Sequence, residues 1–194
     1  MVALTFAVGA TGCKPARQTA AAAQQTAAVV DSVVPRDVAL TAFRECCARV
    51  DSLTGGERSR DALVRGFVRA LETDDTAAFR RMLLTRSEFA WLYYRTNPQS
   101  LPPYNLSPSL MWFLLEGNGA KGLGRLLDEY GGKSLGYLGY TCDEQASAQG
   151  ENTITGPCSV RRVAPDGDTV EARLFGLLLE RGGRWKFINY SNKL

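Results

Sequence analysis

Cysteine is the residue type whose spacing in this sequence predicts a definite chemistry. Cys142 and Cys158 lie equally far from Gly150, where the chain is expected to turn between two antiparallel strands. Thiols that face each other across such strands can form a disulfide, which closes a loop of about 15 residues and stabilises a fold by roughly 3 kcal/mol. The sequence therefore predicts a Cys142–Cys158 disulfide, and the alternative is a pair of buried free thiols.

Cys46 and Cys47 are adjacent in the sequence, and we interpret them as structural thiols. Neighbouring side chains on a helix point about 100° apart, so a bond between them would distort the backbone. A cysteine pair without further Cys or His nearby is weak evidence for a metal. We expect neither a metal nor a cofactor.

The sequence contains no histidine, and this excludes several catalytic classes. Ser-His-Asp and Cys-His catalysis, histidine-ligated metals and histidine proton shuttles all need an imidazole. A carboxylate buried among aromatic rings would have a raised pKa and act as an acid or base. The acids nearest the aromatic-rich region are Glu88, Glu116, Asp128 and Glu129. Glu88 has the position of a capping residue and the last two are expected to be exposed, so we predict no catalytic residue.

Aromatic side chains are the remaining candidates for a binding site. They crowd between Phe89 and Phe113 and continue on the first expected strand. A pocket lined by such rings stacks on an apolar or cyclic ligand, and tyrosine hydroxyls orient that ligand. The predicted ligand-binding residues are Tyr93, Tyr94, Tyr104, Trp112, Tyr137 and Tyr140. The alternative is ordinary core packing beside a tyrosine-rich surface.

A helical period dominates the sequence from Arg36 to Gly132. Apolar residues recur there at steps of three and four, Thr85 and Glu88 have the spacing of a capping box, and Ser107-Pro108 is typical of a helix start. A proline-rich loop interrupts the helices near residue 100. The pattern predicts helices over 36–53, 57–75, 75–84, 85–94, 108–117 and 120–132.

After Gly132 the apolar period changes to two, which is typical of strands. Ala-Gln-Gly, Pro-Asp-Gly-Asp and Arg-Gly-Gly have the composition of the turns between them. The expected strands cover 134–142, 154–163, 169–180 and 184–191. Helices followed by an antiparallel meander predict an α+β fold, in which N-terminal helices pack on one face of a curved antiparallel sheet.

The first 13 residues resemble the signal peptide of a bacterial lipoprotein. Ala10-Thr11-Gly12-Cys13 is similar to the lipobox, and the uncharged apolar run before it is too short for a transmembrane helix. The resemblance implies a diacylglycerol on the Cys13 thiol and a lipid-anchored protein in the bacterial cell envelope, on the periplasmic face or at the outer membrane. No Lys or Arg precedes Lys14, which we interpret as a start codon placed too far downstream or a truncated sequence. The alternative is a disordered cytosolic N-terminus with an incidental cysteine.

Residues 14–35 are rich in Ala, Gln and Thr, a composition that predicts a flexible tether. Its roughly 22 residues reach about 70 Å when extended, enough to hold a single α+β domain, residues 36–194, away from a membrane. Once Cys13 is acylated, four cysteines remain. An even number of cysteines in an oxidising envelope favours disulfides. The 23 basic and 20 acidic residues nearly balance and form no basic cluster, so no nucleic-acid partner is expected.

Two stretches resemble the nuclear transport factor two-like superfamily. LVRGFVRALETDDTAAFRRML is similar to its opening helical unit, and RLFGLLLERGGRWKFINYSN is similar to its last hairpin. The resemblance implies a cone of curved sheet that is closed by helices and encloses a pocket. Members of the superfamily include isomerases, dehydratases, polyketide cyclases and non-catalytic binding or dimerisation domains.

Together these patterns favour an envelope lipoprotein with a non-catalytic module. We expect the module to bind a small apolar ligand, or to pack on an envelope partner or a second copy of itself. The expected strand 169–180 carries apolar residues on both faces, which favours a partner on the sheet. The alternatives are a cyclase- or isomerase-like enzyme that uses a buried acid with tyrosine, and an assembly domain with a filled cone.

Overall fold

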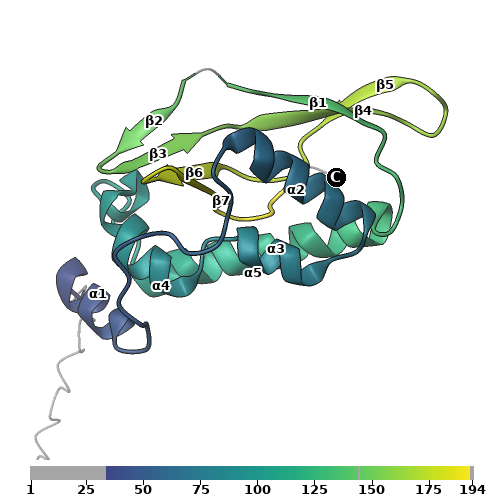
Figure 1. The fold of residues 1–194 in the computed structure, drawn as a ribbon. Coiled ribbons are helices and arrows are strands. Elements are labelled where there is room, and N and C mark those ends of the chain that lie inside the picture. Colours follow the sequence, from purple (N-terminus) through teal and green to yellow (C-terminus); the bar gives the residue numbers. More distant parts are fainter. Residues whose placement is uncertain (1–33, 144, 193–194) are drawn as a thin grey trace, which may run out of the picture. The chain divides into compact units, whose positions relative to one another are not determined.

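Five α-helices precede seven strands in the computed structural model, which describes residues 34–143 and 145–192 (Figure 1). The order confirms the predicted α+β class. Cys13 and the predicted tether up to residue 33 lie outside the described residues. The α-helices are α1 (Arg36–Arg44), α2 (Arg60–Glu72), α3 (Thr76–Met82), α4 (Arg86–Glu88) and α5 (Pro108–Tyr130). Three short helical segments follow α4. They are the π-helix η1 (Phe89–Tyr93) and the 3-10 helices η2 (Tyr94–Thr96) and η3 (Pro98–Ser100).

Helix α1 is shorter than the sequence pattern predicts. It ends at Arg44, where the predicted helix continued to residue 53. The thiols of Cys46 and Cys47 both approach the Phe43 carbonyl oxygen, at 3.3 and 3.4 Å, beyond the end of the helix. The chain from residue 48 onward then leaves the helical direction, and the Thr54 backbone N–H donates to the Glu88 carboxylate.

Helix α5 is longer than predicted, because two expected helices are one. Four glycines between residues 117 and 124 suggested a break, since each costs about 1 kcal/mol relative to alanine inside a helix. Two of them permit a close approach instead. A Cβ on Gly122 would lie 2.0 Å from the Tyr190 carbonyl oxygen, and one on Gly119 would lie 3.3 Å from the Asn189 Cβ. The C-terminal segment therefore packs directly on the helix backbone, and the packing outweighs the propensity.

The strands form two antiparallel sheets rather than the single curved sheet that we predicted. One has the order β1-β4-β5 and the other the order β2-β3-β6-β7. The strands are β1 (Tyr137–Cys142), β2 (Ser147–Gln149), β3 (Asn152–Thr155), β4 (Cys158–Val163), β5 (Thr169–Ala172), β6 (Leu178–Arg181) and β7 (Arg184–Phe187). The hairpin β6–β7 turns at Gly182-Gly183, both at positive φ, as the Arg-Gly-Gly turn predicted.

Two expected strands are divided between the sheets. The stretch 154–163 breaks at Gly156-Pro157, so that β3 belongs to one sheet and β4 to the other. The stretch 169–180 breaks over residues 173–177, and β5 and β6 separate in the same way. Proline cannot donate to a ladder and glycine often marks a bend, which accounts for the first break. Both breaks lie at the junction of the two sheets.

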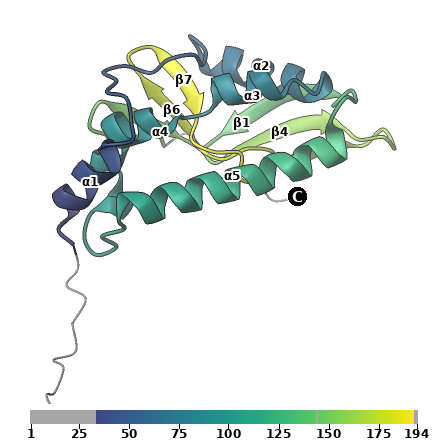
Figure 2. The ribbon, with the colours of Figure 1, turned by 90° about the horizontal axis from the view of Figure 1, so that it is seen from below.

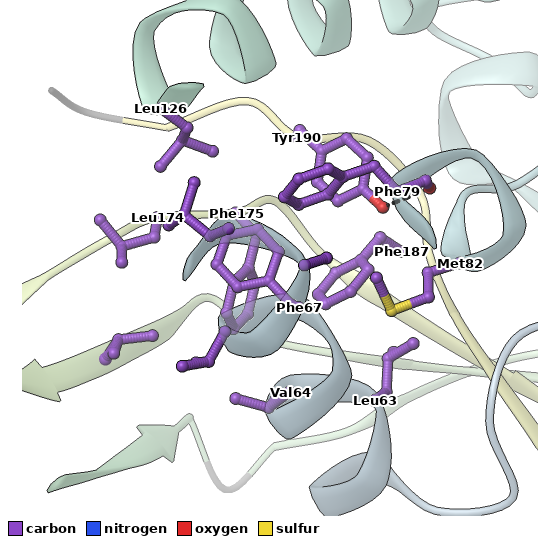
Figure 3. Packing of buried hydrophobic residues seen from close by; sticks show 14 of the residues in the cluster. Leu63, Val64, Phe67, Phe79, Met82, Leu126, Leu174, Phe175, Phe187 and Tyr190 are labelled. Carbon is purple, nitrogen blue, oxygen red and sulfur yellow. Dashed lines mark hydrogen bonds between the residues drawn. The ribbon is translucent and has the colours of Figure 1, made fainter. Parts of the chain in front are cut away.

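The main core lies where α2, α3, α5 and both sheets meet. Phe67 on α2 is at its centre, with ring centroids 5.6 Å from Phe79, 5.1 Å from Phe175 and 5.5 Å from Phe187 (Figure 3). Tyr190 closes the cluster and donates its hydroxyl to the Phe79 carbonyl oxygen at 2.6 Å. The tail of the chain is thereby held between α3 and α5 (Figure 2).

Candidate functional site

A cavity of about 530 Å³ lies at the junction of the two sheets, and we call it the main cavity. Its walls come from both strand breaks (Pro157 and residues 173–177), from η1 and η3, from α5 and from the C-terminal segment. Its volume falls within the range of small-molecule sites. The same breaks that divide the sheets therefore create the principal hollow of the described structure.

The main cavity combines an apolar wall with a polar rim. The apolar residues that line it are Tyr93, Pro98, Met111, Leu115, Pro157, Phe175, Leu177 and Ile188. The polar residues that line it are Asn97, Gln99, Gln149, Arg173, Asn189, Ser191 and Asn192. Among these described residues Arg173 is the single charged side chain, and no carboxylate lines the cavity. The site can therefore bury apolar surface while offering hydrogen bonds and one positive charge.

Some of the polar lining is already paired within the protein. Asn97 donates from Nδ2 to the Tyr93 hydroxyl at 2.6 Å and accepts from the Gln99 backbone N–H at 2.8 Å. Asn192 donates from Nδ2 to the Gly122 carbonyl oxygen at 2.8 Å, and Ser191 donates its hydroxyl to Asn189 Oδ1 at 2.9 Å. These bonds fix the shape of the rim and are not available to a ligand.

Other polar groups of the lining have no partner among the described residues. The Oε1 atom of Gln149 is buried and makes no hydrogen bond. The Arg173 guanidinium is exposed and forms no ion pair or hydrogen bond within residues 34–143 and 145–192. Buried polar atoms are paired in the great majority of cases, so an unpaired one beside a cavity indicates a ligand or water partner.

Tyr93 lies in the wall of the main cavity, and burial shifts its pKa. Burial raises the pKa of Tyr93 to about 12, although the Asn97 hydrogen bond lowers it in part. The phenol therefore stays neutral across the physiological range. It serves as a hydrogen-bonding and stacking group rather than as a base.

A second, smaller hollow of about 210 Å³ is lined by α5 and the C-terminal segment, and we call it the side hollow. It shares Leu115, Ile188 and Asn189 with the main cavity, so the two spaces are neighbours. Its remaining lining is mostly apolar: Leu83, Leu84, Trp112, Glu116, Gly119, Ala120, Leu123 and Tyr190. Glu116 is the charged residue among them.

The six predicted ligand-binding aromatics do not converge on one site. Tyr93 lines the main cavity and Trp112 lines the side hollow. Tyr94 is fully buried, and its hydroxyl donates to the Leu106 carbonyl oxygen at 2.7 Å. Tyr104 is 66% exposed on the proline-rich loop. Tyr137 and Tyr140 lie on β1 and pack against the main core. Phe89 packs against Phe43, Tyr94 and Trp112. Much of the aromatic-rich region therefore belongs to the core, as in the alternative interpretation.

Glu88 forms the capping box that the sequence indicated, and it also belongs to a buried ion pair. Thr85 accepts from the Glu88 backbone N–H, and Glu88 accepts from the Thr85 N–H at 2.8 Å. The Lys186 ammonium lies 2.7 Å from Glu88 Oε2 and also donates to the Thr54 carbonyl oxygen at 2.8 Å. Glu88 and Lys186 are 0% and 1% exposed, and neither lines a hollow described above.

The pKa values of this pair follow from its burial and its hydrogen bonds. Burial alone would raise the pKa of Glu88, but hydrogen bonds from Lys186 and from the Thr85 and Thr54 N–H groups outweigh it, and the pKa is lowered. Burial lowers the pKa of Lys186, against the opposing effect of the carboxylate. The pair ties three segments together, and we assign it a structural role.

The predicted disulfide is present. Cys142 and Cys158 are opposite each other in the β1–β4 ladder and are joined by a bond of 2.06 Å. Among the described cysteines, Cys46 and Cys47 form no disulfide, and the first is exposed and the second half-buried. Within residues 34–143 and 145–192, no group of three or more His, Cys, Asp or Glu side chains could hold a metal ion.

The cavity residues that the sequence analysis did not select come from the strand breaks and the tail. Arg173, Gln149 and Asn189 lie in stretches interpreted as regular strand or turn. Gly156-Pro157 and Gly176, each inside an expected strand, were the signals that these strands bend. No helix of the described part of the chain is long and apolar enough to span a bilayer. No protein family, curated protein or solved structure matches the chain.

Proposed function

We propose that this protein is a non-catalytic module that binds a small amphipathic molecule in the main cavity. The observation that carries the proposal is the contrast within the lining: an apolar wall beside polar groups that have no partner among the described residues. Burying apolar ligand surface supplies affinity of about 25 cal/mol per Å², and the polar rim supplies orientation. The neutral Tyr93 phenol and the lone Arg173 offer no acid–base pair for an isomerase or cyclase.

The domain is, in this proposal, a nuclear transport factor two-like cone in which the two sheets are the halves of one bent sheet. Three observations support it. The chain β3–Gly156-Pro157–β4 runs without interruption from one sheet into the other (Figure 1). Helices α2, α3 and α5 contribute to one core with strands of both sheets, and the cavity lies at the bend.

We also propose that the module is tethered to the bacterial cell envelope through a lipid on Cys13. The lipobox-like Ala10-Thr11-Gly12-Cys13 supports this location, and so does the Cys142–Cys158 disulfide, because such bonds persist in oxidising compartments. Expression of the full-length gene in a bacterial host tests it. The protein is expected in the detergent phase of a phase separation, and Cys13→Ser is expected to move it to the aqueous phase. An unchanged distribution would exclude the anchor.

The binding function is tested with the full chain purified without reductant, and 1-anilinonaphthalene-8-sulfonate as the probe. We expect saturable binding at one site. Leu177 lies at the mouth of the main cavity and is 38% exposed, so Leu177→Trp should weaken the probe about tenfold by filling the space. Leu138→Trp is the matched control, because Leu138 is 50% exposed on β1 and lines neither hollow.

Native mass spectrometry of the same preparation supplies an independent measurement. A co-purified small molecule that Leu177→Trp removes and Leu138→Trp retains would support the proposal. Absence of saturable probe binding together with a clean apo mass would exclude it, and so would equal loss of binding in the two tryptophan variants.

Assembly is a second candidate, favoured by an exposed apolar row on α5. Leu110, Phe113 and Leu114 are 46%, 69% and 42% exposed and share one side of the helix. The apolar residues of 173–180 that suggested a sheet partner are, by contrast, mostly buried: Leu174, Phe175, Leu178 and Leu179. A dimer in light scattering that Phe113→Glu dissociates would favour assembly, and a monomer would exclude self-association through α5.

A further inference from the structure

We infer that the ligand is a single-chain anionic amphiphile, with its head group at Arg173 in the main cavity and its alkyl tail in the side hollow. The inference rests on the proposed binding function and names the class of molecule. Three observations support it: the opposite charges of the two linings, the unused hydrogen-bond donors of the main cavity, and the residues that line both spaces.

The two hollows differ in charge. Among the described lining residues, Arg173 is the charged one in the main cavity and Glu116 is the charged one in the side hollow. A negative head group is attracted by the first and repelled by the second, so the charges give a bound anion one orientation. The strongly apolar remainder of the side hollow, with Leu83, Trp112 and Leu123, suits a hydrocarbon and offers little to a polar group.

The main cavity holds hydrogen-bond donors that the protein does not use. Among the described residues, the guanidinium of Arg173 and the side-chain amide nitrogens of Gln99 and Gln149 make no hydrogen bond. The Asn189 amide is engaged through Oδ1, which leaves its nitrogen free in the same part of the chain. Donors that line the same cavity as a cation match the acceptor oxygens of an anion such as a carboxylate.

The two hollows are neighbours. Leu115, Ile188 and Asn189 belong to both linings. Leu115 is half-buried on α5, and its flexible side chain can turn aside, whereas the Ile188 backbone is held by a 2.9 Å hydrogen bond to the Leu177 carbonyl oxygen. In this inference an unbranched alkyl chain passes beside Leu115, and a fused-ring ligand is too wide to follow it.

Straight-chain alkanoates of six to sixteen carbons test the inference, with the full chain and isothermal titration calorimetry. Each methylene buried in the side hollow should tighten binding about fourfold until the hollow is full. Alkanols of equal length lack the charge and should bind about tenfold more weakly. Arg173→Gln should remove that difference, and Arg161→Gln, an exposed arginine outside both linings, should retain it.

Filling the side hollow should shorten the longest chain that gains affinity. Ala120 lines the hollow, so Ala120→Phe is expected to end the gain at shorter chains while leaving the six-carbon acid unchanged. Asn118→Phe is the control, because Asn118 is exposed on the same helix and lines neither space. Both are neutral substitutions, and thermal unfolding verifies that both variants are folded.

The outcomes separate this inference from the proposed function. Probe binding in the main cavity without any dependence on chain length, or with the same length dependence in Ala120→Phe, would overturn the alkyl-tail assignment and leave the cavity as a binding site. Equal affinity for alkanoates and alkanols would overturn the head-group assignment. Loss of probe binding and of alkanoate binding together would remove both proposals.

Discussion

Two polar regions of this domain are built in opposite ways. At Glu88 every available partner is in place: the carboxylate accepts from Lys186, from the Thr54 N–H and hydroxyl, and from the Thr85 N–H. At the main cavity Arg173 and the Gln149 amide have no partner among the described residues. Glu88 and Lys186 are buried, whereas the Arg173 side chain is exposed.

The difference separates structural polarity from polarity kept for a ligand. A buried charge is tolerated when its partners are complete, and such a cluster holds segments of the fold in register. Unpaired groups around a cavity do not stabilise the fold, and a buried one destabilises it until a ligand or water provides a partner. The pair at Glu88 was the natural catalytic candidate by chemistry, and its completeness argues against that role.

Breaking the Glu88–Lys186 pair should give the largest effect. Glu88→Gln leaves the Lys186 ammonium buried without a counter-charge, and the free energy of unfolding is expected to fall by about 3–5 kcal/mol. The measurement is urea unfolding followed by circular dichroism. Glu72→Gln is the matched control: Glu72 also accepts a backbone N–H, from Leu135 at 2.8 Å, but it is half-buried and has no buried cation beside it.

A double substitution sharpens this result. Glu88→Gln combined with Lys186→Met removes both charges, and it should be more stable than Glu88→Gln alone, because no unpaired charge remains. A double variant as unstable as the single one would show that the hydrogen bonds of Glu88 to Thr54 and Thr85 dominate instead of the ion pair.

Opening the Cys142–Cys158 disulfide should give the next largest effect. The bond closes a loop with a sequence separation of 16. Replacing both cysteines by serine should lower the free energy of unfolding by about 3 kcal/mol. The native chain in reductant should match that variant in urea unfolding. Cys46→Ser removes an exposed free thiol and should change the stability by less than about 0.5 kcal/mol.

Acid should reduce the stabilisation that the buried Glu88–Lys186 pair gives to the fold. The folded pKa of Glu88 is lower than its ordinary value of 4.5, so its contribution to stability is complete above that value and is lost as the pH falls through the folded pKa. Urea unfolding between pH 7 and pH 3 should show the native chain losing its advantage over Glu88→Gln below about pH 4.5. A gap that stays constant down to pH 3 would contradict the assignment.

The same contrast explains which features the sequence could reveal. The capping box joins Thr85 to Glu88 three residues away, and the disulfide spans a recognisable turn, so local rules found both. Lys186 is 98 residues from Glu88, and no local pattern connects the two. The β6–β7 hairpin was also predictable, because its Gly-Gly turn follows a general rule.

The cavity could not be predicted from the sequence, because it forms where the chain departs from the local strand and helix patterns. Residues 154–163 and 169–180 were predicted as continuous strands. Gly156-Pro157 and Gly176 signal a bend in each, but the sheet that each half joins is decided by tertiary contacts. The glycines of α5 indicated a break, yet the tail from Asn189 to Asn192 packs on them and the helix continues. In each case a contact made far along the chain outweighs the local preference, and single-sequence reasoning does not include such contacts.

The smallest effect on stability should come from Arg173, and a matched arginine makes this informative. Arg181 donates to Asn152 Oδ1 at 3.3 Å and pairs with Glu151, and its side chain is 17% exposed, so Arg181→Gln should cost about 1–2 kcal/mol. Arg173→Gln removes no interaction within the described residues and should change the free energy of unfolding by less than about 0.5 kcal/mol. Urea unfolding of the two variants measures both.

A cost above about 1 kcal/mol for Arg173→Gln would mean that this cation already has a partner inside the folded chain. The region around the cavity would then resemble the Glu88 cluster, and its charge would belong to the fold. A negligible cost combined with lost selectivity for anions would place the entire contribution of Arg173 in binding, since a group that the fold does not use is free to be used by a ligand.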